Sequence, residues 1–77
     1  MNTEEIKGFE QLSEQNKATF KQFLANWLAA QGMTARNEIL PLSVRFVREG
    51  KEKYLRFDFL RGGNETWLHV RSAYSWD

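Results

Sequence analysis

The chain contains no cysteine and has a single histidine and a single proline. Without cysteine it can form no disulfide, and the usual thiolate ligands of zinc are missing. The carboxylates do not form an Asp/Asn-rich loop with calcium spacing. We therefore expect no metal and no other cofactor. The absence of cysteine also favours a reducing, cytoplasmic location.

Long apolar runs and a strong net charge are missing as well. No apolar stretch approaches the roughly 20 residues of a membrane-spanning helix, and residues 1–5 are acidic, unlike the start of a signal peptide. The formal net charge is +1, which argues against strong nonspecific binding to polyanions. These absences predict a soluble cytoplasmic protein that has no membrane partner.

The chain is short but rich in aromatic side chains. Its 77 residues include three Trp, six Phe and two Tyr, and large rings supply much buried area per residue. A chain of this size buries only about 60% of its unfolded surface. We expect residues 1–77 to form one small domain, with a free energy of unfolding of about 5 kcal/mol.

Three segments in the second half of the chain alternate between apolar and polar residues. They are Leu42–Arg48, Tyr54–Leu60 and Trp67–Ser72, and the last pattern extends through Tyr74 and Trp76. Such alternation predicts β-strands with one apolar face. That face, which we call the inner face, would carry Leu42, Val44, Phe46, Leu55, Phe57, Phe59, Leu68 and Val70.

Two short linkers join these strands. Glu49–Glu52 contains Gly50, and Gly62–Glu65 contains two glycines and an asparagine, residues that tolerate the positive φ of hairpin turns. The linkers are too short for a parallel crossover. The sequence therefore predicts a three-stranded antiparallel meander with Tyr54–Leu60 in the middle.

One amphipathic helix precedes the strands. Phe20, Phe23, Leu24, Trp27 and Leu28 form a single stripe at helical spacing. Ser13 is a suitable N-cap and Gly32 a suitable left-handed stop. Before the helix, Ile6, Phe9 and Leu12 indicate a short helical turn, whereas Met33–Leu40 reads as a connector. The predicted fold is α+β, an αβββ chain with the helix packed on the inner face.

One helix can cover only one face of the sheet, so the opposite face is expected to be open. We call it the outer face. By the alternation it carries Ser43, Arg45, Val47, Tyr54, Arg56, Asp58, Leu60, Trp67, His69 and Arg71.

The arginines of the outer face depend on the strand register. With four-residue turns, Arg56 would lie between Arg45 and Arg71, Asp58 beside Ser43 and His69, and Leu60 beside Trp67. Opposed like charges are unfavourable, and a row of guanidinium groups suits an anionic partner. A two-residue turn would instead stagger the arginines, which would then be ordinary solvated side chains.

We consider three classes of function. The first is a non-enzymatic binding module that engages an acidic or mixed protein surface, or a second copy, through the outer face, because Trp, Tyr and Arg concentrate in interfaces. The second is a single-stranded nucleic-acid binder, with rings stacking on bases and arginines on phosphates. The partner-binding residues would be Arg45, Tyr54, Arg56, Trp67, His69 and Arg71 in both classes.

Catalysis is the third class. Asp58 could orient His69, and Ser43 could be the nucleophile. An open sheet face offers no pocket or oxyanion hole for such chemistry. We therefore expect no enzyme, and we favour a protein partner over nucleic acid.

Overall fold

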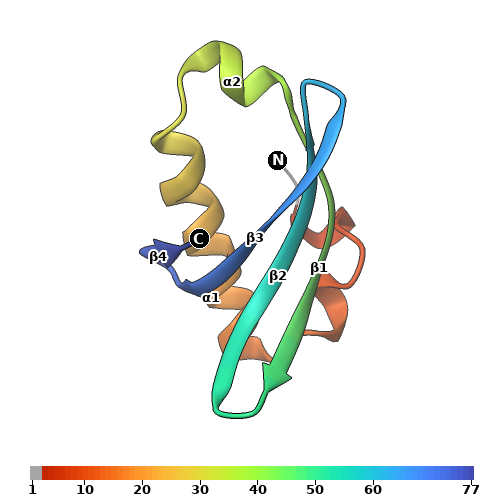
Figure 1. The fold of residues 1–77 in the computed structure, drawn as a ribbon, viewed down its shortest axis with the longest axis vertical. Coiled ribbons are helices and arrows are strands. Elements are labelled where there is room, and N and C mark those ends of the chain that lie inside the picture. Colours follow the sequence, from red (N-terminus) through yellow and green to blue (C-terminus); the bar gives the residue numbers. More distant parts are fainter. Residues whose placement is uncertain (1–2) are drawn as a thin grey trace.

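The computed structural model describes residues 3–77, in which one long helix packs on an antiparallel sheet (Figure 1). The helical elements are η1 (Thr3–Glu5), η2 (Phe9–Gln11), α1 (Glu14–Ala29) and α2 (Met33–Asn37). The strands are β1 (Ile39–Glu49), β2 (Glu52–Arg61), β3 (Asn64–Ser72) and β4 (Ser75–Trp76), in the order β1-β2-β3-β4. The α+β class and the antiparallel sheet are confirmed. The predicted count of three strands is wrong, because β4 adds a short fourth strand.

The long helix begins where the sequence indicates and ends earlier than predicted. The Ser13 side chain accepts a hydrogen bond from the Asn16 backbone N–H at 3.1 Å, so Ser13 is the N-cap of α1. At the other end, Gly32 has φ −70° and precedes α2, so it is not a left-handed stop. The predicted connector therefore contains a five-residue helix, Met33–Asn37. Within residues 3–77, no helix is both long and apolar enough to cross a membrane.

The two main hairpins have different outcomes. Arg45 pairs with Arg56, as predicted, although Glu49 pairs with Glu52, so the first turn has two residues and not four; a turn of either length is centred between Gly50 and Lys51, which keeps the register. In the second hairpin Arg61 pairs with Asn64, which leaves a two-residue turn. Both residues of that turn, Gly62 and Gly63, have positive φ (58° and 84°), the requirement of a tight hairpin turn. The β2–β3 register is consequently two residues away from the predicted one.

A β-bulge interrupts β1. Pro41 pairs with Phe59 and Ser43 with Asp58, so Leu42 is an extra residue without a partner in β2. The prediction that Leu42 continues the inner row of Val44 is therefore wrong. Because the bulge changes the phase of the strand, Ile39 is buried on the inner face and Leu40 lies on the outer face.

The core lies between α1 and the inner face. The Phe57 side chain is fully buried in the middle of the sheet, and its ring centroid lies 5.3 Å from that of Phe20, 5.9 Å from Phe23 and 5.5 Å from Trp27. Val44, Leu55, Phe59 and Val70 surround it, and Leu68 packs at the border. The predicted stripe of α1 therefore packs on the predicted inner face.

Residues 3–12 add to this core from the side of β1. Ile6, Phe9 and Leu12 are buried. The Val44 backbone N–H donates a hydrogen bond to the Lys7 carbonyl at 2.9 Å, which places the segment beside β1, an edge strand. It lies next to the edge, where Lys7 and Gly8 border the outer face beside Ser43 and Arg45.

The chain reverses once more after β3. Val70 pairs with Trp76, and the Asn26 side-chain amide donates to the Ala73 carbonyl at 2.9 Å. The Trp76 ring packs against Phe23 at a centroid distance of 5.4 Å. The idea that the third strand runs on through Tyr74 and Trp76 is therefore wrong, and Trp76 instead closes one side of the core.

Candidate functional site

The outer face is not covered by any helix or strand of residues 3–77. Its side chains form transverse rows, because antiparallel partners lie directly opposite one another. The rows are Arg45–Arg56–His69, Ser43–Asp58–Trp67 and Leu40–Leu60–Glu65. A fourth row contains Val47 and Tyr54, beside which Arg71 lies.

The predicted row of three arginines is wrong. Arg56 lies opposite His69 and not Arg71, because the second turn has two residues. For the same reason Asp58 lies opposite Trp67, and Leu60 lies opposite Glu65. Two arginines, Arg45 and Arg56, remain side by side. The repulsion between like charges, which a bound anion would relieve, is therefore smaller than in a continuous row of three arginines.

Arg56 is held by its neighbours on the outer face. Its Nε donates to Asp58 at 3.1 Å, and the Ser43 hydroxyl donates to the other oxygen of the same carboxylate at 3.2 Å. The guanidinium carbon lies 5.1 Å from the centroid of the Trp67 ring, which is a cation–π contact. Arg45 has no ion-pair partner in the described part of the chain. Of the two neighbouring arginines, Arg45 is thus the one whose guanidinium is available to pair with an anionic group of a partner.

Tyr54, His69 and Arg71 form a second cluster. The Tyr54 and His69 rings stack at a centroid distance of 4.3 Å, and the Arg71 guanidinium lies 5.7 Å from the Tyr54 ring. Arg71 also pairs with Asp77 at 3.4 Å. Tyr54 was predicted on the open surface, yet only 9% of it is exposed. The side chains of His69 and Arg71 pack on its ring, so Tyr54 positions these two side chains and does not itself present a ring to a partner.

The Tyr54 hydroxyl is also engaged. It donates a hydrogen bond to the Glu49 carboxylate at 3.2 Å. Burial, followed by this hydrogen bond to a negatively charged group, raises the pKa of the Tyr54 hydroxyl above its ordinary value. The phenol therefore stays neutral near physiological pH and acts as a hydrogen-bond donor.

An apolar corner lies at the end of the outer face nearest α2. Trp67 is 54% exposed and Leu40 is 57% exposed, and half-buried Leu60 pairs directly with Leu40. Trp67 was predicted to be on this surface, whereas Leu40 was not. The bulge at Leu42 is what turns Leu40 outward, and nothing in the alternation of the sequence marks it. We call Leu40, Leu60 and Trp67 the apolar corner.

A small hollow of about 400 Å³ borders β1 on the same face. Lys7, Gly8, Ser43, Val44, Arg45 and Asp58 line it. Lys7, like Arg45, has no ion-pair partner among residues 3–77, whereas the single acid, Asp58, already binds Arg56. The hollow therefore carries an excess of positive charge. Lys7 is not among the predicted contact residues, because its approach to Ser43 spans 36 positions of chain and no local pattern signals it.

The residues considered for catalysis are not assembled. Ser43 donates its hydroxyl proton toward Asp58, and His69 stacks on Tyr54 one row away. Asp58 thus orients Arg56 and Ser43, and it does not lie opposite the imidazole. Residues 3–77 hold no cluster of three or more His, Asp or Glu side chains that could bind a metal ion.

The outer face thus combines three features: the Arg56 guanidinium against the Trp67 ring, the apolar corner to which Trp67 belongs, and the positively charged hollow beside β1. Among known proteins, no family model, no curated protein and no solved structure matched this chain.

Proposed function

We propose that this chain is a non-enzymatic binding module that uses the outer face to engage an acidic or mixed protein surface. The observation that carries the proposal is the exposure of Trp67 and Leu40, each more than half accessible, on the same face as Arg56, which lies against the Trp67 ring, and unpaired Arg45, which lies opposite Arg56. A large exposed ring next to an arginine is typical of the centre of a protein interface.

The contacts already present on this surface favour binding with little rearrangement. Asp58 fixes Arg56, and Arg56 in turn lies over the Trp67 ring. An ordered side chain loses little conformational entropy when a partner covers it. In the proposed complex the apolar corner is covered first, and a carboxylate of the partner reaches Arg45 and Lys7.

The six predicted contact residues divide into two groups under this proposal. Arg45, Arg56 and Trp67 contact the partner directly. Tyr54, His69 and Arg71 form the stacked cluster that supports one end of the surface. The near-complete burial of Tyr54 also supports a protein partner over single-stranded nucleic acid, because a covered ring cannot stack on a base.

A photoreactive amino acid in place of Trp67 tests the proposal. We expect covalent capture of one discrete partner in the source cells, and loss of this product when Arg45→Glu is added. The matched control carries the same photoreactive residue at Ala18, which is exposed on α1. Equal products from positions 67 and 18, or no product from position 67, would contradict the proposal.

Two further measurements separate the possible partners. Solution mass over a concentration series detects a second copy on the outer face. Binding of a mixed single-stranded oligonucleotide, with an affinity that falls linearly on a log–log plot against salt, would favour nucleic acid instead. We further propose a cytoplasmic location, which the absence of cysteine supports.

A further inference from the structure

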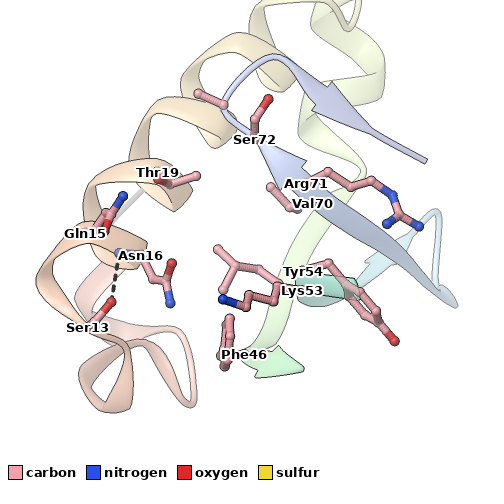
Figure 2. A pocket seen from close by; sticks show the side chains of 12 residues that line it. Ser13, Gln15, Asn16, Thr19, Phe46, Lys53, Tyr54, Val70, Arg71 and Ser72 are labelled. Atoms are coloured by element: carbon pink, nitrogen blue, oxygen red, sulfur yellow. Dashed lines mark hydrogen bonds between the residues drawn. The ribbon is translucent and has the colours of Figure 1, made fainter. Parts of the chain in front are cut away.

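A groove opens on the inner face, on the opposite side of the sheet from the surface described above. It lies between the first half of α1 and the ends of β1, β2 and β3, and its volume is about 540 Å³ (Figure 2). Phe46, which is 46% exposed, contributes most of its apolar surface above the nearly buried Leu55 and Val70, whereas Asn16 and Thr19 line it from the helix. The volume falls within the range of about 300–1,000 Å³ that is usual for small-molecule sites.

The sequence of α1 explains why the groove stays open. Phe46 pairs with Leu55 on the inner face, where it was predicted to be core, yet it is 46% exposed. The residues of α1 that line the groove with it are polar, namely Gln15, Asn16 and Thr19. The apolar stripe of the helix begins only at Phe20. This end of the inner face therefore lacks an apolar cover from its own helix.

The charge of the groove is positive. Lys53 reaches over Phe46 toward the helix in Figure 2, and it has no ion-pair partner in the part of the chain that the structure describes. Arg71 lines the groove only with its stem, because its guanidinium turns away to Tyr54 and Asp77. No acidic residue lines the groove, so the Lys53 ammonium is left for a ligand.

The helix side of the groove offers hydrogen-bonding groups. In Figure 2 the Asn16 side-chain amide points into the space between α1 and Phe46. The backbone N–H of Asn16 donates to Ser13, while its side-chain amide has no hydrogen-bond partner among residues 3–77. A ligand in the groove would thus meet an amide on one side, an ammonium at the mouth and an apolar floor.

We infer that this groove binds a small organic carboxylate with a ring-sized apolar body. The ring would lie on Phe46, Leu55 and Val70, and the carboxylate would accept hydrogen bonds from the Lys53 ammonium and the Asn16 amide. Charge complementarity selects the anion, because the lining holds a free cation and no acid. The site goes beyond the proposed function, since the groups that would hold the carboxylate and its ring differ from Arg45, Arg56 and Trp67, although Tyr54 and Arg71 border both surfaces.

Titration of the ¹⁵N-labelled chain with indole-3-acetate tests this inference by NMR. We expect saturable shifts at the amides of Phe46, Leu55 and Val70, and none at Trp67. The uncharged probe indole-3-acetamide has the same ring and should bind about five-fold more weakly, the factor that a partly exposed ion pair contributes. Absence of saturable shifts, equal binding of the two probes, or shifts centred on Trp67 would overturn the inference.

Two variants locate the charge. Lys53→Gln should abolish the preference for the acid over the amide, whereas Lys51→Gln, which removes the same charge from the neighbouring turn, should retain it. Phe46→Ala should weaken both probes to a similar extent. Unchanged spectra away from the groove show that each variant is folded. Concentration-dependent shifts at Phe46 without any probe would mean that a second copy fills the groove, which would also overturn the inference.

Discussion

Adjacent residues of β2 lie in contrasting environments on the two faces of the sheet. Phe57 on the inner face is enclosed by three aromatic rings of α1. Arg56 on the outer face contacts only Asp58, Trp67 and the strands themselves. The inner face is therefore determined by packing against another layer, whereas the outer face is held by contacts between its own side chains. Changes on the inner face should mainly affect folding, and changes on the outer face should mainly affect binding.

The largest effect is expected from Phe57→Ala. Removing a fully buried phenylalanine costs about 3–5 kcal/mol, which is comparable to the whole stability of about 5 kcal/mol expected for such a chain. Urea denaturation followed by circular dichroism measures the loss. The matched outer-face variant Trp67→Ala should cost less than about 1 kcal/mol. Similar losses of stability for the two variants would contradict the conclusion that the inner face contributes more to folding than the outer face.

Gly8→Ala tests whether the packing of residues 3–12 beside β1 contributes to the stability of the core. Gly8 has φ +90°, and an added Cβ would collide with the Val44 carbonyl oxygen. We expect a loss of at least about 2 kcal/mol, because a left-handed alanine alone costs about 1–2 kcal/mol. Gly50→Ala is the control, since Gly50 has φ +58° and open space around it. If both variants lose the same stability, the approach of Gly8 to β1 contributes nothing.

Arg56→Glu should separate binding from folding. It replaces the part-buried ion pair with Asp58 by two neighbouring carboxylates, which Arg45 opposite position 56 partly offsets, so the free energy of unfolding should fall by about 1–2 kcal/mol without loss of the fold. Affinity for the cross-linked partner should fall by about ten-fold or more. Arg36→Glu, an exposed charge reversal on α2, should leave affinity unchanged. An unfolded Arg56→Glu chain would show that the outer face is as sensitive as the inner one.

The smallest effect concerns Tyr54 and is confined to alkaline pH. Burial and Glu49 raise the pKa of its hydroxyl in the folded chain. The neutral phenol therefore contributes stability that is fully present below the unfolded pKa of about 10 and is lost as pH rises through the folded value. Urea midpoints measured from about pH 8 to about pH 11 should fall less steeply for Tyr54→Phe. The control Tyr74→Phe, whose ring is exposed, should follow the parent chain, and identical slopes for all three would contradict the assignment.

Much of the inner face could be predicted from local sequence alone. The alternation in Tyr54–Leu60 and the stripe from Phe20 to Leu28 both reflect burial, and burial is what those periodicities encode. Phe46 is the exception. Its alternation is correct, but its exposure depends on how far the apolar part of α1 reaches along the sheet, which is a property of the packed layers.

The outer face depended on details that the sequence does not encode locally. Gly62-Gly63-Asn64-Glu65 is compatible with turns of two or four residues, and the choice between them moves Arg71 away from Arg56. The bulge at Leu42 and the reversal at Ala73 contain no glycine and no asparagine, so neither was anticipated. The approach of Lys7 to Ser43 is a long-range contact. Each of these features changes which side chains of the outer face are neighbours.

The unpaired residue in β1 makes this strand unusually tolerant of one kind of mutation. Losing a single amino acid from a regular strand reverses the facing of every residue on one side of the gap. Leu42 is different, since Pro41 and Ser43 already hold consecutive partners in β2. A codon deletion at position 42 would convert the irregular ladder into a continuous one while Ile39 stays inward and Leu40 outward. A deletion of Val44 or Arg45 would instead turn the inward residues outward, and the outward residues inward, on one side of the gap.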